Sequence, residues 1–263
     1  MTAPSAPAPL VFITGASSGI GQALAEEFAR HGWSLALVAR REPEVRDWAR
    51  ALALPQGRVG VYAADVRDPQ GMADAAAACL AAQGLPDVVI ANAGISVGMD
   101  TAEREDLDVM RDTLATNVTG MATTFHPFVG AMRERGRGTL VGIASVAAIR
   151  GLPGHGAYCA SKAAVVAYCE SLRGECRASG VKVVTLLPGY IATPLTARNP
   201  YPMPFLMPAA AFAQRAFRAI AAGDSYRVIP WQMGVVAKLL RLLPNPLFDR
   251  VFAGRGRKPR RGT

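Results

Sequence analysis

The sequence predicts an α/β domain in which a doubly wound parallel sheet lies between two layers of helices. Short, nearly uniformly apolar runs alternate with longer segments of helical spacing from residue 10 to residue 229, and no composition break or fixed-period repeat interrupts them. Uniformly apolar runs suit strands that are covered on both faces, and strands alternating with helices imply right-handed crossovers within one sheet. We therefore expect one domain with a three-layer α/β/α architecture.

The expected elements follow in chain order. Apolar, β-branched runs predict seven strands, at Leu10–Thr14, Ser34–Ala39, Arg58–Ala63, Asp87–Ala91, Gly138–Ala144, Lys182–Leu187 and Tyr226–Ile229. Helical spacing predicts helices over Gly21–His31, Pro43–Leu52, Pro69–Gln83, Glu105–Arg135 and Gly156–Ser179.

Three segments lie outside this alternation. Residues 1–9 are rich in Ala and Pro, and we expect a flexible tail before a domain that spans residues 10–252. Residues 190–207, rich in Pro, Met, Phe and Tyr, are too broken for a strand. Residues 231–252 return to helical spacing, interrupted by Pro244 and Pro246, and predict a C-terminal helical extension before a basic tail at 253–263.

Composition excludes several classes of protein. With 51% hydrophobic and 19% charged residues, the chain is neither disordered nor a collagen-like, mucin-like or disulfide-dense scaffold. Its four cysteines form no CxxC pair and no secretory leader precedes them, so we expect free thiols in a reducing cytoplasm. The three histidines are far apart, and we expect neither a metal site nor a membrane-spanning helix.

The loop between the first strand and the first helix reads Thr14-Gly15-Ala16-Ser17-Ser18-Gly19-Ile20-Gly21. Glycines permit a tight turn and let backbone amides approach a pyrophosphate, while the helix N-terminus supplies partial positive charge. The spacing is TGxxxGxG rather than the commoner GxGxxG. Its position between a strand and a helix favours a nucleotide site over a simple turn.

The residues at the end of the second strand indicate which nicotinamide dinucleotide the chain would bind. An acid there would bind the ribose hydroxyls, whereas an arginine accommodates a 2′-phosphate. Arg40 and Arg41 stand about 20 residues beyond the glycine loop, and the first acid after the second strand is Glu42. These residues favour NADP(H) over NAD(H); the alternative is a solvated charge pair at a helix start.

Two short motifs follow the third and fourth strands, at the sheet edge where ligands bind in such folds. They are Asp65-Val66 and Asn92-Ala93-Gly94. The small residues after Asn92 leave room for a flat ligand, although either motif alone is also ordinary turn chemistry.

Ser145, Tyr158 and Lys162 carry the strongest chemical signal. Tyr158 and Lys162 are four residues apart and share one helix face. An unperturbed tyrosine has a pKa near 10, and a nearby ammonium together with a cationic nicotinamide would lower that pKa toward the working range. Ser145, at the end of the preceding strand, can hold a substrate oxygen while the tyrosine transfers the proton.

With these pieces in place, the chain resembles the short-chain dehydrogenase/reductases over nearly all of residues 10–229. The matching pieces are the glycine loop, Asp65-Val66, Asn92-Ala93-Gly94, Asn117, Ser145, Tyr158-Cys159-Ala160-Ser161-Lys162 and Pro188-Gly189-Tyr190-Ile191-Ala192-Thr193. The resemblance implies a Rossmann-like fold with a bound nicotinamide dinucleotide.

The resemblance also implies a role for each matching residue. Tyr158 is the general acid/base, Ser145 polarises the carbonyl, and Lys162 lowers the tyrosine pKa and holds the nicotinamide ribose. Asn117 holds a water of a proton relay, and residues 190–207 form a substrate lid. Together with the two arginines, the expected cofactor-binding set is Gly15, Ser17, Ser18, Gly19, Ile20, Gly21, Arg40, Arg41, Asp65, Val66, Asn92, Ala93, Gly94, Tyr158, Lys162, Pro188, Gly189, Ile191 and Thr193.

The expected activity is the reversible, NADPH-linked reduction of a ketone or aldehyde to an alcohol. The lid is apolar, which suits a hydrophobic substrate, although its residues could equally pack onto the core. These residues are Leu195, Tyr201, Met203, Phe205, Leu206 and Met207. The alternatives are an NAD(H)-dependent alcohol dehydrogenase and a non-catalytic, nucleotide-sensing scaffold.

Partners follow from the same residues. The resemblance implies a homodimer or homotetramer that pairs through the helices containing Asn117 and Tyr158. The apolar C-terminal extension and the basic tail fit peripheral contact with an anionic membrane, and they fit equally a pocket seal or an oligomer contact. No groove-entering motif or aromatic platform accompanies the tail, so we expect no nucleic-acid partner.

Overall fold

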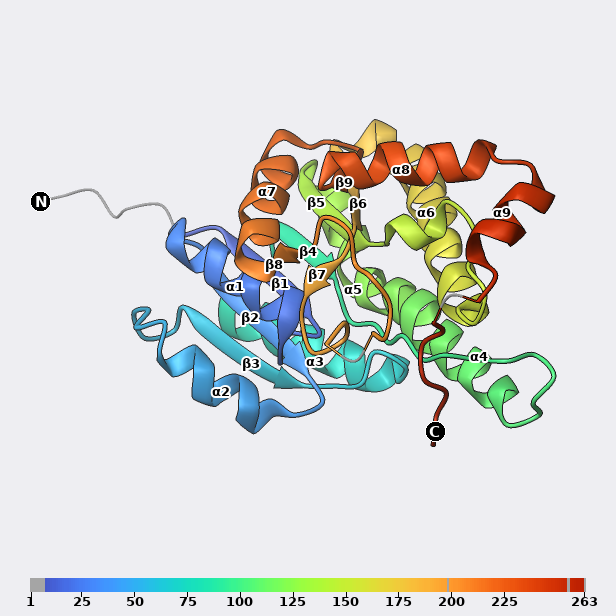
Figure 1. The fold of residues 1–263 in the computed structure, drawn as a ribbon. Helices are drawn as coiled ribbons and strands as arrows, with labels where there is room; N and C mark the ends of the chain where they lie inside the picture. The colour runs from blue at the N-terminus through green and yellow to red at the C-terminus, as the bar shows by residue number, and fades with distance from the viewer. Residues whose placement is uncertain (1–7, 198, 255, 263) are drawn as a thin grey trace, which may run out of the picture.

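A seven-stranded parallel sheet runs through the centre of the computed structural model, which describes residues 8–197, 199–254 and 256–262 (Figure 1). Most of the expected N-terminal tail, residues 1–7, lies outside the described residues. The strand order is β3-β2-β1-β4-β5-β6-β9, so the chain reverses direction across the sheet between β1 and β4. The strands are β1 (Leu10–Thr14), β2 (Ser34–Ala39), β3 (Val59–Ala63), β4 (Val88–Ala91), β5 (Gly138–Ile143), β6 (Val181–Pro188) and β9 (Tyr226–Ile229).

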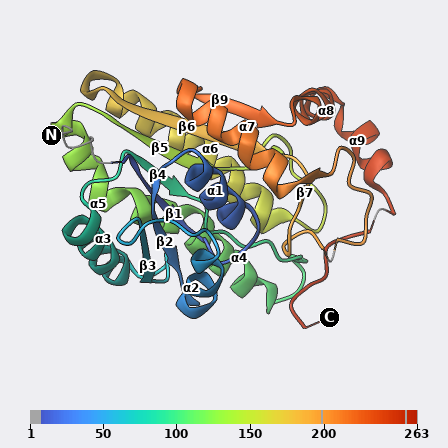
Figure 2. The ribbon, with the colours of Figure 1, turned by 90° about the vertical axis from the view of Figure 1, so that its left-hand side faces the viewer.

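The uniformly apolar strands are explained by two hydrophobic cores, one on each face of the sheet. In β1, Val11 and Ile13 join one core while Leu10 and Phe12 join the other. The first core is covered by three helices, α1 (Gly19–Arg30), α2 (Glu42–Arg50) and α7 (Ala209–Ala222). The second core is covered by α3 (Pro69–Gln83), α5 (Gly120–Arg135) and α6 (Gly156–Cys176) (Figure 2). The three-layer, seven-stranded prediction is confirmed.

The long helix expected over residues 105–135 is divided into three parts. Helix α4 (Asp106–Leu114) leads into a π-helical turn at Ala115–Thr119, and α5 continues from Gly120. A π turn adds one residue to the helical repeat, which the spacing of apolar residues does not show. Its position is relevant to function because Asn117 lies within it.

Two further expectations were incomplete. Helix α7 was not predicted; its sequence AAAFAQRAFRAIAA gives a weak apolar pattern, because most of its buried positions are alanines. The lid segment contains two short strands, β7 (Ile191–Ala192) and β8 (Met207–Pro208), which pair in parallel, so the expectation that it holds no strand was wrong at its two ends.

The C-terminal extension forms α8 (Trp231–Leu242) and α9 (Asn245–Phe252), with the break at Leu243 and Pro244. All four cysteines are buried free thiols. Among the described residues, none of the helices has the length and apolar character needed to cross a bilayer.

Candidate active site

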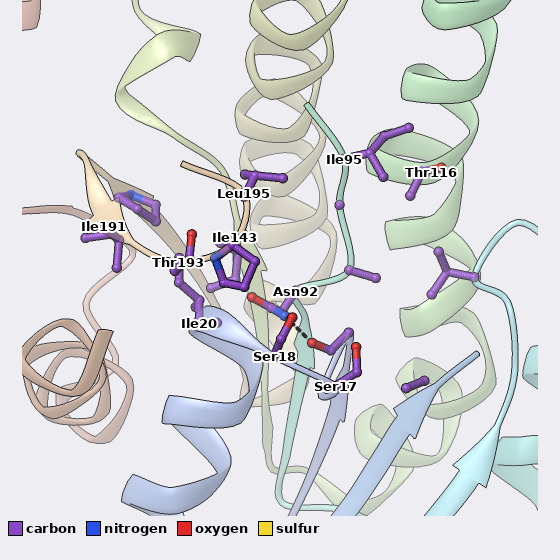
Figure 3. A pocket seen from close by; sticks show the side chains of 18 of the residues that line it. Ser17, Ser18, Ile20, Asn92, Ile95, Thr116, Ile143, Ile191, Thr193 and Leu195 are labelled. Atoms are coloured by element: carbon purple, nitrogen blue, oxygen red, sulfur yellow. Dashed lines mark hydrogen bonds between the residues drawn. The ribbon is translucent and has the colours of Figure 1, made fainter. Parts of the chain in front are cut away.

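A cavity of about 450 Å³ opens at the carboxyl ends of the central strands, where the strand order reverses. Crevices at such a reversal are where open α/β sheets bind ligands. The wall combines the glycine turn after β1, the ends of β2 to β6 and the start of the lid (Figure 3). In Figure 3, Ile20 and Thr193 lie next to each other, with Ile95 and Thr116 on the opposite side of the cavity.

The glycine turn is shaped by close backbone contacts. Gly15 has φ +69°, and a Cβ there would lie 2.8 Å from Ala93 Cα. A Cβ at Gly21 would lie 2.2 Å from the Gly15 carbonyl oxygen. Contacts this short exclude any side chain at the two positions, so the turn can adopt its shape only with glycine there.

The N-terminus of α1 has N–H groups that no side chain caps. The helix begins at Gly19, and its first turn carries no acid. Its first N–H groups and partial positive charge therefore remain available to a phosphate. Asn92 supports the turn from below, because its side-chain amide donates to the Thr14 carbonyl at 3.0 Å and to the Gly15 carbonyl at 3.2 Å.

The end of the cavity at β2 and β3 is positively charged. Arg40 and Arg41 both line it and are more than half exposed. Arg40 lies 3.9 Å from the Asp65 carboxylate, which Arg67 binds more closely at 2.7 Å. The hydrogen bond from Arg67, with smaller contributions that include Arg40, lowers the pKa of Asp65 below its ordinary value. Two guanidinium groups thus line this end, and Arg67, which sequence reasoning missed, binds the Asp65 side chain beside them.

Ser145, Tyr158 and Lys162 all line the other end of the cavity. Lys162 is 5% exposed, and its ammonium donates to the Ile143 carbonyl oxygen at 2.8 Å. That ammonium lies 5.8 Å from the centre of the Tyr158 ring. The structure therefore brings the predicted trio together at the C-terminal end of β5.

The pKa values of this trio follow from burial. Burial lowers the pKa of Lys162 to about 8, so it remains largely protonated at neutral pH. Burial also raises the pKa of Tyr158, and a hydrogen bond with Ser145 opposes that rise. The expectation that Lys162 and a bound nicotinamide lower the tyrosine pKa stays a prediction; in this structure the Lys162 ammonium donates to the Ile143 carbonyl.

Asn117 is 1% exposed and uses its side-chain amide entirely within the protein. Its Oδ1 accepts the Ile95 N–H at 2.8 Å, and its Nδ2 donates to the Ile95 carbonyl at 3.0 Å and to the Ser161 hydroxyl at 2.9 Å. Asn117 thereby joins the β4–α4 loop to α6. A Cβ at Gly94 would lie 3.2 Å from Asn117 Oδ1 and 3.5 Å from Lys162 Nζ, which explains the need for a small residue after Asn92.

The segment after β6 closes the cavity on the side of α8. A Cβ at Gly189 would lie 2.7 Å from Met233 Cγ, so α8 packs directly against this turn. Thr193 packs against Gly19, and the apolar lid residues Ile191, Pro194 and Leu195 reach the cavity. Phe205 and Leu206 are instead about half exposed on the surface, at 51% and 48%.

Most predicted site residues line this one cavity, with Gly21 and Asn117 as the exceptions among them. Both exceptions act from behind the wall, Gly21 through the turn and Asn117 through Ile95. The lining residues that the sequence did not indicate include Ile95 and Thr116, which carry no motif of their own. Within the described part of the chain, no cluster of three or more His, Cys, Asp or Glu side chains could hold a metal ion.

Comparisons with known proteins agree with this geometry. The family model described as short chain dehydrogenase matches residues 9–201. An uncharacterized oxidoreductase of Myxococcus xanthus is 40% identical over 240 residues, covering 90% of this chain and 93% of that relative. A sulfoacetaldehyde reductase of Chromohalobacter salexigens is 38% identical over 191 residues, covering 71% of this chain and 74% of that relative.

Solved structures resemble the fold closely. A short chain dehydrogenase/reductase from Burkholderia phymatum in complex with NAD superposes with a TM-score of 0.80 at 25% identity, covering 89% of this chain and 92% of that one. An alcohol dehydrogenase from the archaeon Thermococcus sibiricus, complexed with 5-hydroxy-NADP, gives a TM-score of 0.75 at 27% identity, covering 84% of this chain and 95% of that one.

Proposed function

Because the chain belongs to the short-chain dehydrogenase/reductase family, we propose that it reduces a ketone or aldehyde to an alcohol with NADPH, in a reversible reaction. The observation that carries the proposal is the single cavity that unites an anion-binding glycine turn, an arginine-rich end and the Ser145, Tyr158 and Lys162 side chains. These are the groups that a dinucleotide and a carbonyl require. A scaffold that only binds nucleotide has no need for the Ser145, Tyr158 and Lys162 side chains.

The cavity fits the cofactor in its chemistry. The turn before α1 and the N–H groups of that helix would hold the pyrophosphate, and Lys162 would hold the nicotinamide ribose. When bound, the dinucleotide supplies or accepts the hydride.

The chain's own residues handle the oxygen. Ser145 donates a hydrogen bond that polarises the carbonyl, and Tyr158 delivers the proton that converts the oxygen to a hydroxyl. In the reverse direction, Tyr158 accepts that proton. Asn117 fixes the Ile95 side of the cavity against α6, so the wall opposite the lid stays in place.

The preference for NADPH rests on Arg40 and Arg41, whose guanidinium groups suit a 2′-phosphate. The similar structures were solved with NAD and with an NADP analogue, so the preference is argued from this chain's residues alone. An NAD(H)-dependent dehydrogenase is the alternative.

The substrate end has an apolar wall, formed by Ile95, Ile143 and Leu195 beside Tyr158. We therefore propose a carbonyl compound with an apolar body. The name of the Chromohalobacter salexigens relative, a sulfoacetaldehyde reductase, supports reduction of a carbonyl group as the reaction class.

Turnover of NADPH with a panel of aromatic and long-chain carbonyl compounds tests the proposal. We expect oxidation of NADPH by the wild type and a loss of at least about a hundredfold in kcat for Tyr158→Phe. Tyr168→Phe on the same helix, outside the cavity, is the matched control and should keep its activity. Equal inertness of wild type and Tyr158→Phe, with tight cofactor binding by both, would favour the nucleotide-sensing scaffold.

Association through other surfaces is proposed separately. Pairing through α5 and α6 predicts a dimer or tetramer in sedimentation experiments.

On α8, an exposed apolar stripe beside Lys238 fits the peripheral membrane contact expected from the sequence; it is formed by Trp231, Val235, Leu239 and Leu242. Co-sedimentation with anionic vesicles, lost in Leu239→Glu, is the test.

A further inference from the structure

The C-terminal tail runs back from α9 toward α4 (Figure 1). The Gly98 N–H donates to the Pro259 carbonyl at 3.0 Å, and Gly98 forms a parallel β-bridge with Arg260. A Cβ at Gly154 would lie 3.0 Å from the Arg257 side chain, and one at Gly256 would lie 3.2 Å from the Pro200 carbonyl oxygen. The tail therefore touches the β4–α4 loop, the loop before α6 and the lid.

Ion pairs hold the tail in this position. Arg260 Nε binds the Asp106 carboxylate at 2.7 Å, and Asp106 is 2% exposed. The backbone N–H of Asp100 and the Arg260 guanidinium together lower the pKa of Asp106. Arg261 pairs with Asp112 at 2.7 Å and Arg257 with Asp100 at 3.7 Å. Three tail cations are thus neutralised by carboxylates of α4 and of the loop before it.

Lys258 is different from these three arginines. It is half-buried, and its ammonium donates to the lid carbonyl of Leu195 at 3.1 Å. No carboxylate of the described residues pairs with it. Leu195 lines the same cavity as Ser145 and Tyr158, so this ammonium lies at the rim of that cavity. Burial lowers the pKa of Lys258, as expected for a cation without a counter-ion.

The tail also lies next to His155, because the Arg257 side chain packs against Gly154. The charge of Lys258 is close enough to His155 to lower the pKa of that histidine, for which burial is the larger cause. His155 Nε2 hydrogen-bonds the Tyr201 hydroxyl at 3.0 Å. Burial and the nearby Tyr190 and Tyr158 raise the pKa of Tyr201. The His155–Tyr201 pair therefore lies near Lys258, where the lid meets the loop before α6.

We propose that the Lys258 ammonium is a binding site for an anionic group on the substrate. Resting on the proposed carbonyl reduction, this assigns the substrate class: carbonyl compounds with an apolar body and a carboxylate or sulfonate at the end remote from the carbonyl. The apolar wall accommodates the body, and the tail supplies the positive charge that recognises the anion. The arginine pairs hold the tail so that Lys258 stays at the rim.

The test compares straight-chain ω-oxo carboxylates of increasing length with their methyl esters. At the best length, we expect wild type to favour the acid over its ester by about tenfold in kcat/KM, the factor for one charge-assisted hydrogen bond at a partly exposed site. Lys258→Met should bring that ratio to about one while leaving ester turnover unchanged. Lys238→Met, which removes an exposed lysine on α8, should keep the ratio.

Two results would overturn the assignment. One is an acid-to-ester ratio near one at every length in the wild type. The other is an acid-to-ester ratio that Lys258→Met leaves unchanged. If kcat/KM then falls equally for acid and ester, Lys258 only holds the lid in place. Arg260→Ala gives a second check, because release of the tail should lower the ratio as Lys258→Met does.

A failure of the proposed carbonyl reduction can be distinguished from a failure of the proposed anion site. If neither acid nor ester is reduced, calorimetry on the enzyme saturated with NADP⁺ compares binding of the ω-hydroxy acid with that of its methyl ester. Tighter binding of the acid that Lys258→Met abolishes would retain the anion site and reject the reaction. Equal binding of acid and ester would overturn the anion site.

Discussion

Replacement of Lys162 by methionine should stabilise the protein while abolishing its activity. One pKa unit corresponds to 1.36 kcal/mol, so lowering the pKa from 10.5 to about 8 means that the buried charge costs roughly 3 kcal/mol of folding free energy at neutral pH. Methionine removes the charge but leaves the Ile143 carbonyl without its 2.8 Å partner, at a cost of about 1 kcal/mol. The net expectation for Lys162→Met at pH 7 is a gain of about 2 kcal/mol.

The pH dependence gives this prediction a definite sign. Below pH 8 the lysine is charged in both the folded and the unfolded chain, and the whole penalty applies. Between about 8 and 10.5 the folded state releases its proton first, so the unfolded state binds more protons and the stability of the wild type rises with pH. The advantage of Lys162→Met should therefore shrink across this interval.

Urea denaturation, followed by tryptophan fluorescence at several pH values, measures both effects. Lys238→Met is the control, and its stability should stay within about 0.5 kcal/mol of the wild type, as for surface substitutions in general. A Lys162→Met variant that is less stable than the wild type at pH 7 would refute the reasoning. So would a stability difference that does not change with pH.

Three other substitutions have distinct expected outcomes. Arg40→Asp should weaken NADPH binding by about tenfold or more and improve NADH binding, in fluorescence titrations with each cofactor; tighter NADH than NADPH binding by the wild type would contradict the proposed preference. Asn117→Ala should cost about 3 kcal/mol in urea denaturation, because it leaves both Ile95 backbone groups unpaired and removes the hydrogen bond to the Ser161 hydroxyl, which keeps only its bond to the Tyr158 carbonyl; a loss below about 1 kcal/mol would show that water replaces the amide. Gly21→Ala should lose NADPH binding and about 1–3 kcal/mol of stability, because its Cβ would lie 2.2 Å from the Gly15 carbonyl oxygen. Gly130→Ala in α5 is the control; its Cβ has open space around it, so its stability should be unchanged or slightly higher. Equal effects of the two substitutions would count against the close contact at Gly21.

The parts of the site that the sequence predicted are those set by local spacing. Tyr158 and Lys162 share a helix face because they are four residues apart, and the glycine turn stands between a strand and a helix. Parallel strands end at one edge of the sheet, which is why Asp65, Asn92 and Ser145 could be expected in one place.

The remaining features depend on contacts between distant segments. The π turn that positions Asn117 leaves no mark in the apolar spacing. The tail arginines read as free positive charge in the sequence, yet Arg260 and Arg261 bind Asp106 and Asp112, about 150 residues earlier in the chain. The pKa of Tyr158 likewise depends on burial, which opposes the influence expected from a neighbouring lysine.

Transfer of deuterium from NADPH labelled at C4 of the nicotinamide tests the central claim most directly. If this cavity binds the dinucleotide beside Tyr158 and catalyses hydride transfer, one of the two C4-labelled forms should place its deuterium on the carbinol carbon of the alcohol, detected by mass spectrometry. An alcohol that forms without deuterium from either labelled form, or no alcohol from any carbonyl compound under conditions where NADPH binds, would contradict the account.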